Sequence, residues 1–305
     1  MSGLDTASLL TLSYGGDFGA CKVLCGSVDR FVAPSISHTL YVPQNDLPLF
    51  APLMGARRKV QAQETLIPRW LWRLPLPGPA WRARLRLPRR NVYLTPFSKP
   101  VRGWIAQQIM KIEAASRAAD EVVVHVDSDN AFIRPLTMQA LVKPEGVRLY
   151  LNPKRVELDT HRLWHQTAAH LLDARADDFH AGDPIDPIVV WRRSLVRAMI
   201  ARLEAVNGRE WRRVLAATPH FSEYVLYSVF AECVAGWAAS GHAVEPFSLS
   251  FGLWHEPLAD MRAEEAFLDT LSPHHLLCLI QSTVGMDDAA RRALFARVEA
   301  RAGGA

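Results

Sequence analysis

Apolar residues in the N-terminal part of the chain alternate between strand-like runs and helical spacing. The short apolar run Ser8–Ser13 ends at Tyr14-Gly15-Gly16, which predicts a buried strand followed by a turn. Asp17 is a suitable helix N-cap, and apolar side chains behind it recur at the spacing of one helix face: Phe18, Cys21, Cys25, Val28 and Val32. The pattern then predicts a strand, a short helix and a strand, at His38–Val42, Asp46–Leu53 and Lys59–Ala62. This alternation is typical of a parallel sheet with crossover helices.

The middle of the chain carries a helix and the most clearly strand-like segment. Pro100–Ala118 has an apolar stripe at helical spacing, while Trp104, Gln108 and Lys111 share a different face of the same helix. Glu121–Val126 is an apolar strand that ends in Asp127-Ser128-Asp129. Weaker patterns predict further elements at Arg148–Leu151, His161–Ala174, Pro187–Trp191, Leu195–Glu204, Ser222–Trp237 and Leu276–Gln281, and a closing helix from Asp287.

Composition is that of an ordinary globular protein. The chain has 305 residues, 49% of them hydrophobic and 22% charged, and a mean hydropathy of zero. Since no apolar run reaches the roughly 18 residues of a membrane-spanning helix, a multi-span membrane protein is excluded. The first residues lack the pattern of a secretory signal, so we expect a cytoplasmic protein. We predict an α/β fold in one domain over residues 1–305, with a mixed, mostly parallel sheet flanked by helices and a helical C-terminal part.

Asp127 and Asp129 stand two residues apart at the end of an apolar strand. In extended chain both side chains point to the same side, where two carboxylates repel unless a cation lies between them. Mg²⁺ or Mn²⁺ fills this role and keeps coordination sites open for phosphate oxygens. Ligands of open α/β sheets bind beyond the carboxyl ends of the strands, which suits a diphosphate. The alternative is that both residues are turn acids exposed to solvent.

Several segments in this order resemble one protein family. They are TLSYGGDFGACKVLCGSVDRFV, DLPLFAPL, VRGWIAQQIMKIEAA, VVVHVDSDNAFIRP and FSEYVLYSVF. In these segments the chain resembles the bacterial DUF6492 group, which is itself similar to GT-A fold glycosyltransferases. The resemblance spans roughly Leu9 to Gln281. It implies a GT-A-like, Rossmann-like fold with a nucleotide-sugar-binding half over residues 1–135 and an acceptor-binding half with C-terminal helices over residues 136–305.

The resemblance also implies roles for individual residues. Tyr14 and Asp17 would hold the nucleobase and ribose of the donor, and Lys111 would reach its phosphates. Asp127 and Asp129 match the metal-binding Asp-x-Asp motif, with Mn²⁺ or Mg²⁺ as the ion. A third metal ligand, often a histidine, is expected towards the C-terminal end, where His255 is the first candidate. The alternatives for Tyr14, Asp17 and Lys111 are a turn residue, a helix cap and a solvated helix charge.

Glu223 is the candidate for a catalytic base or an acceptor anchor. Inverting sugar transfer requires a carboxylate to take the proton of the acceptor hydroxyl. The alternative is structural, because an acidic residue in the first turn of a helix is stabilised by the helix dipole.

The segment Arg69–Arg90 contains seven arginines, three tryptophans and no acidic residue. It interrupts the strand and helix rhythm as a loop or insertion over residues 67–90. Arginines with interleaved tryptophans suit anionic lipid headgroups or nucleic acid, or they surround tryptophans that pack inward. We favour peripheral contact with the inner face of the membrane and expect no nucleic acid partner.

Taken together, these patterns favour a metal-dependent glycosyltransferase. It would transfer a sugar from a UDP- or GDP-sugar donor to a hydroxyl of a glycan, a lipid-linked saccharide or a small molecule. Two alternatives stay open. One is a catalytically silent GT-A-like module that binds partners or an anionic membrane, and the other is a nucleotidyl- or phosphotransferase that uses the same Asp pair.

Overall fold

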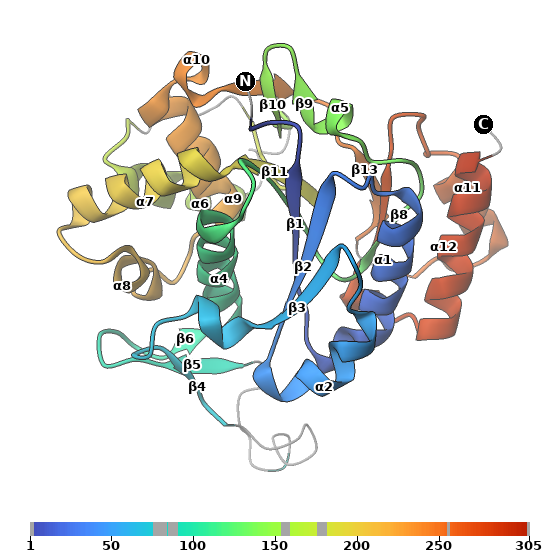
Figure 1. The fold of residues 1–305 in the computed structure, drawn as a ribbon, viewed down its shortest axis with the longest axis horizontal. Helices are drawn as coiled ribbons and strands as arrows, with labels where there is room; N and C mark the ends of the chain where they lie inside the picture. The colour runs from blue at the N-terminus through green and yellow to red at the C-terminus, as the bar shows by residue number, and fades with distance from the viewer. Residues whose placement is uncertain are drawn as a thin grey trace.

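A five-stranded mixed sheet forms the centre of the protein (Figure 1). The structure is a computed structural model and describes residues 3–75, 84, 91–153, 159–175, 182–254 and 257–303. The sheet has the strand order β11-β7-β1-β2-β3. Its strands are β1 (Ala7–Leu12), β2 (Ile36–Val42), β3 (Arg58–Ala62), β7 (Val122–Val126) and β11 (Ile188–Arg192). All neighbours run parallel except β11, which lies antiparallel to β7 at one edge. The predicted fold class, an α/β protein with a mostly parallel sheet, is therefore confirmed.

Crossover helices cover both faces of this sheet, as the N-terminal pattern predicts. Helix α1 (Phe18–Phe31) connects β1 to β2, and its predicted apolar residues Cys21, Cys25 and Val28 are buried. Asp17 occupies the predicted N-cap position, and its side chain makes no capping hydrogen bond there. On the opposite face lies α4 (Gly103–Arg117), in which Gln108 and Lys111 are as buried as the isoleucine stripe.

Three small sheets surround the central one. Their strand orders are β13-β14-β8, β12-β10-β9 and β4-β5-β6. The first contains β8 (Asn130–Phe132), β13 (Ser250–Leu253) and β14 (Leu277–Ile280). The second contains β9 (Val142–Lys143), β10 (Gly146–Tyr150) and β12 (His242–Glu245). The third contains β4 (Trp72–Arg73), β5 (Val92–Leu94) and β6 (Val101–Arg102).

The remaining helices lie mainly in the second half of the chain. They are α2 (Leu47–Phe50), α5 (Met138–Leu141), α6 (Asp159–Leu172), α7 (Arg193–Asn207), α8 (Trp211–Ala216), α9 (Glu223–Val229), α10 (Trp237–Ser240), α11 (Met261–Leu268) and α12 (Asp288–Gly303). The single helix predicted over Ser222–Trp237 is wrong. Helix α9 continues into a π-helical turn, Phe230–Ala235. The helix then ends at Gly236, whose φ of 77° lies in the left-handed region.

The predicted loop or insertion over residues 67–90 is only partly described. Trp72–Arg73 form strand β4 and Leu71 is buried, so its beginning is part of a sheet rather than a loop. Residues 76–83 and 85–90 lie outside the described residues. Among the described residues, no helix is long and apolar enough to cross a membrane.

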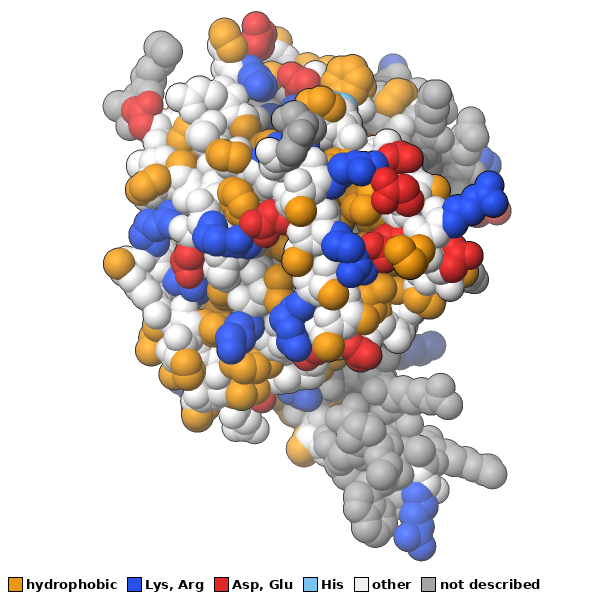
Figure 2. Space-filling model, turned by 90° about the vertical axis from the view of Figure 1, so that its right-hand side faces the viewer, with side chains coloured by type: hydrophobic (Ala, Val, Ile, Leu, Met, Phe, Trp, Pro, Cys, Tyr) orange, Lys and Arg blue, Asp and Glu red, His pale blue; other side chains and the backbone are white. Residues whose placement is uncertain are grey.

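The C-terminal helices α11 and α12 form a face of mixed charge (Figure 2). Figure 2 shows Lys and Arg side chains interspersed with Asp and Glu over this side of the molecule. Several of them pair across elements, as in Arg30–Glu299, Arg297–Glu264 and Arg301–Glu265. Pairs as exposed as these contribute little to stability, but they leave the face without an excess of one sign.

Candidate functional site

Three hydrogen bonds to main-chain carbonyls fix the acidic segment at the end of β7. The Oγ1 of Thr11 donates to the carbonyl of Val126 at 2.8 Å, and Nδ2 of Asn130 donates to the carbonyl of Asp127 at 2.9 Å. The amide of Ile280 on β14 donates to the carbonyl of Asp129 at 3.1 Å. Because β8 begins at Asn130, the two carboxylates project from a short connection clamped between two sheets.

Three carboxylates gather here, from Asp17, Asp127 and Asp129. Burial, together with the charges of Asp127 and Asp17, raises the pKa of Asp129 to about 6, although its Oδ2 accepts a hydrogen bond from the amide of Ser282 at 2.9 Å. Burial also raises the pKa of Asp17, with a further contribution from Asp127. The negative charge of Asp127 thus contributes to the raised pKa of both Asp17 and Asp129, and a cation bound here would relieve that repulsion.

A buried ammonium group lies beside Asp127. The Nζ of Lys111 is 3.0 Å from Oδ1 of Asp127, 3.3 Å from Oε1 of Glu223, and donates to the hydroxyl of Tyr224 at 2.8 Å. We call these four residues the Lys111 cluster. Burial alone lowers the pKa of Lys111, but Asp127, Tyr224 and Glu223 outweigh it and raise that pKa well above its usual value. The ammonium thus lies within ion-pair distance of two carboxylates and donates a hydrogen bond to a phenol.

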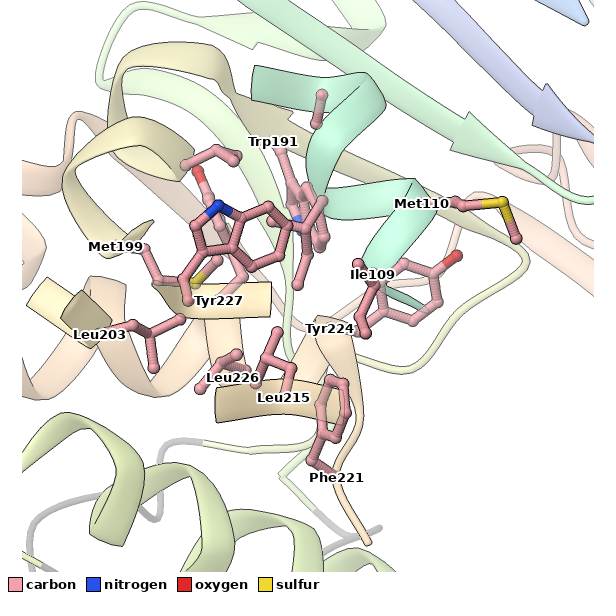
Figure 3. Close-up of a cluster of buried hydrophobic side chains, with 14 of the residues drawn as sticks. Ile109, Met110, Trp191, Met199, Leu203, Leu215, Phe221, Tyr224, Leu226 and Tyr227 are labelled. Atoms are coloured by element: carbon pink, nitrogen blue, oxygen red, sulfur yellow. The ribbon is translucent and has the colours of Figure 1, made fainter. Parts of the chain in front are cut away.

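Glu223 begins helix α9 within the apolar interior. Ser222 caps this helix as predicted, accepting from the amide of Val225, and Oε1 of Gln108 accepts from the amide of Glu223 at 2.8 Å. Burial raises the pKa of Glu223, and Lys111 opposes that shift. Figure 3 shows the apolar surroundings of the next residue, Tyr224, which lies among buried side chains such as Ile109 and Met110. Only Asp127 links this cluster to solvent, with 45% of its side chain exposed against 6% for Glu223.

Tyr14 and Asp17 lie on the turn after β1, as predicted. Tyr14 is 51% exposed, and both Tyr14 and Ser128 hydrogen-bond to the Asp17 carboxylate. The Tyr14 ring packs over Gly16, where a Cβ would stand 2.4 Å from the ring and displace it. The amide of Gly15 donates to Oδ2 of Asp46 at 2.7 Å. The exposed phenol ring is thereby supported next to the three carboxylates and offers a flat surface to a ligand.

Arg291 of α12 is a site residue that the sequence analysis missed. Its Nη1 donates to the carbonyl of Ile280 at 2.6 Å, its charge opposes the rise in the pKa of Asp17, and the side chain is buried. The sequence shows only a helix of mixed charge there, so no local signal separates Arg291 from its neighbours.

A second polar network, also missed, reaches the same strand end from the far side. The Nε of Arg58 donates to Nδ1 of His38 at 3.0 Å, and Nε2 of His38 lies 3.2 Å from Oγ1 of Thr11, which donates to Val126. We call this series the His38 chain. Burial, with Arg58 nearby, lowers the pKa of His38 to about 3. The imidazole is therefore neutral, with its proton on Nε2.

The predicted third metal ligand, His255, lies outside the described residues. The amide of Gln281 bonds to the carbonyl of Leu253, so the described chain leading towards His255 runs beside the strand that contacts Asp129. Across the described part of the chain, no group of three or more His, Cys, Asp or Glu is arranged to hold a metal ion. Among the described residues, Asp127 and Asp129 are therefore not part of a completed coordination shell.

One family model matches most of the chain. It covers residues 7–287 and is described as a family of unknown function, DUF6492. The chain belongs to the DUF6492 family. No curated protein matches this DUF6492 protein. The family resemblance inferred from the sequence motifs is thereby confirmed, and the matched range contains every residue of the Lys111 cluster and the three carboxylates. Arg291 lies beyond it.

Proposed function

We propose that this DUF6492 protein is a metal-dependent glycosyltransferase. It would transfer a sugar from a UDP- or GDP-sugar to a hydroxyl of a glycan, a lipid-linked saccharide or a small molecule. The observation that carries the proposal is the gathering of Asp17, Asp127 and Asp129 at the ends of β1 and β7, beside a buried Lys–Glu pair. Ligands of open α/β sheets bind at that edge, and the similarity of the motifs to GT-A enzymes supports the same reading.

Asp127 and Asp129 would hold Mn²⁺ or Mg²⁺. Asp127 already lies beside Lys111, and Asp129 already accepts from the amide of Ser282 and from Nδ2 of Asn130. Carboxylate oxygens accept more than one bond, so both residues keep lone pairs for a hard cation. The bound ion would supply Lewis-acid stabilisation of the leaving diphosphate.

Residues around the pair would hold the donor. The exposed ring of Tyr14 fits stacking against a nucleobase, and the Asp17 carboxylate fits hydrogen bonding to ribose hydroxyls. Lys111 shares its charge between Asp127 and Glu223. It would therefore orient both carboxylates, and its positive charge would help neutralise the donor phosphates.

Glu223 would take the proton of the acceptor hydroxyl. The acceptor oxygen forms a bond to the anomeric carbon, the bond from that carbon to the diphosphate oxygen breaks, and the nucleoside diphosphate leaves with both electrons of that bond. Burial raises the pKa of Glu223, and a higher pKa makes its carboxylate a stronger base. A role for Glu223 as an acceptor anchor would move the proton transfer to another group.

The test is thermal unfolding with a panel of nucleoside diphosphates, each with and without Mn²⁺. A ligand that binds only the folded state adds about 2.7 kcal/mol at a hundred times its Kd. We expect a shift that requires both the metal and one diphosphate, and its loss in Asp127→Asn and Asp129→Asn. The exposed Asp5→Asn variant is the matched control. No shift with any nucleotide would refute the proposal and favour a catalytically silent module.

Product analysis separates the enzymatic alternatives. With the sugar nucleotide that the shift identifies, a glycosyltransferase releases a nucleoside diphosphate. Release of pyrophosphate or inorganic phosphate would instead assign the Asp pair to a nucleotidyl- or phosphotransferase.

A further inference from the structure

The positive charge of this protein is concentrated in one segment. Residues 69–102 contain nine Lys and Arg and no acidic residue, which leaves 26 Lys and Arg against 31 Asp and Glu for the rest of the chain. The net charge of +4 therefore comes entirely from this segment, and the remaining residues are net negative. A charge separation of this kind orients a protein on an oppositely charged surface.

The described part of this segment folds into the sheet β4-β5-β6, which has one buried and one outward face. Register places Tyr93 and Val101 on the same face, and both are buried in the main core. The opposite face carries Trp72, Val92, Leu94 and Arg102. Trp72 is 47% exposed and Arg102 is also exposed. The outward face is thus built from an indole, two aliphatic side chains and a guanidinium, where solvated sheets normally present polar residues.

Further exposed groups of the same two kinds border this sheet. Phe97 is 44% exposed, with the guanidinium of Arg213 lying 3.8 Å from the centre of its ring. Arg69 and Lys99 are exposed as well. By contrast, the cations of the α11 and α12 face in Figure 2 are interspersed with acidic partners.

We infer that the outward face of β4-β5-β6, with Phe97 and the cations beside it, docks on an anionic lipid bilayer. Cations near a negatively charged leaflet each contribute electrostatic attraction, and Trp and Phe insert at the headgroup level. Nucleic acid fits this face less well, because its outward positions pair aliphatic side chains with a single guanidinium and lack the polar groups that read bases.

Docking in this way would turn the candidate site towards the bilayer. In Figure 1, β4, β5 and β6 lie at the same end of the molecule as the carboxyl ends of β1, β2 and β3. A protein held by this sheet therefore presents Tyr14, Asp17 and the acidic pair near the lipid surface. This orientation, which rests on the proposed function, favours a lipid-linked acceptor over a soluble one.

The test is co-sedimentation of the full-length protein with phosphatidylcholine vesicles that contain or lack phosphatidylglycerol, without nucleotide or metal. We expect binding to the anionic vesicles only, and weaker binding when the salt concentration rises from about 0.1 M to about 0.5 M. Arg69→Glu and Lys99→Glu should each lower the partition coefficient at least about fivefold, and Trp72→Ser should lower it by a similar factor.

Matched controls lie on the mixed-charge face. Arg292→Glu and Met261→Ser, both exposed there, should bind anionic vesicles like the unaltered protein. Thermal unfolding of every variant reports whether it is folded. Three outcomes would each overturn the inference: equal binding to neutral vesicles, unchanged binding of the Arg69, Lys99 and Trp72 variants, or binding of an oligonucleotide in place of vesicles. Because the assay contains no nucleotide, its failure would leave the proposed enzymatic function standing.

Discussion

Two buried polar networks meet the end of strand β7 from opposite sides, and they differ in how they carry charge. The His38 chain ends at the carbonyl of Val126, and its histidine is neutral because burial and Arg58 lower the pKa of His38 to about 3. The Lys111 cluster includes Asp127 itself and places one cation between two carboxylates. The charge of the His38 chain lies on Arg58, which pairs with Asp29 away from β7, whereas the second network places a charged group at the strand end itself, in Asp127, with 45% of that side chain exposed.

This difference assigns a structural role to the His38 chain and a functional role to the Lys111 cluster. The neutral imidazole of His38 connects Arg58 to Thr11 by hydrogen bonds, and Thr11 fixes the position of the Val126 carbonyl. A buried ion cluster is expensive to desolvate and is weak evidence for stability, so its presence beside a solvent-exposed carboxylate points to a functional role. Three substitutions test the distinction, in decreasing order of expected effect.

Lys111→Met should cause the largest loss of stability. It leaves Glu223 without its cation, and breaking a buried ion pair in this way costs about 3–5 kcal/mol. Without Lys111 the folded-state pKa of Glu223 rises further above the unfolded value, so the loss should be greatest well above pH 4.5 and smaller near it. Urea unfolding near pH 4.5 and well above it measures the loss of stability and its pH dependence. A small loss at either pH would show that the cluster is not held together by its charges, and Lys22→Met on the exposed side of α1 is the control.

His38→Leu should cost less, about 1–3 kcal/mol at pH 7. It leaves the Nε of Arg58 and the hydroxyl of Thr11 without their partner. The unfolded chain binds a proton at His38 below about pH 6.5, whereas the folded one does so only near pH 3. Wild-type stability should therefore fall by roughly 1.4 kcal/mol for each pH unit below 6.5, a contribution that the variant lacks. The two stabilities should converge on acidification, and a parallel pH dependence would contradict a neutral His38. The exposed His220→Leu variant is the control.

Asp129→Asn should have the smallest effect, and one of opposite sign. Because the folded-state pKa of Asp129 is raised to about 6, the wild type loses stability as pH rises from about 4 to 6. Removing the charge should therefore stabilise the protein at pH 7 and leave its stability at pH 4 almost unchanged. An amide oxygen can still accept from Ser282, so the fold is kept. If the variant is instead destabilised at pH 7, Asp129 belongs to the scaffold, like His38.

The sequence by itself determined the elements whose burial follows a simple period. The first strand, helix α1, helix α4 and strand β7 are visible because apolar residues recur there at the spacing of a helix face or in an unbroken strand run. The placement of Asp127 and Asp129 at a strand end, and of Glu223 behind the Ser222 cap, follows from the same local patterns. Membership of the DUF6492 family was likewise readable from the order of short motifs.

Only the tertiary structure decided which charges meet. Lys111 and Glu223 are far apart in the chain and contact each other because α4 and α9 pack on the same side of the sheet. The His38 chain crosses β3, β2, β1 and β7, and Arg291 arrives from the last helix. A charge has no periodicity that reveals its partner, since its burial depends on which elements the hydrophobic faces bring together. Local pattern therefore locates these side chains along the chain, and packing alone determines whether they become a buried ion cluster, a neutral relay or a surface.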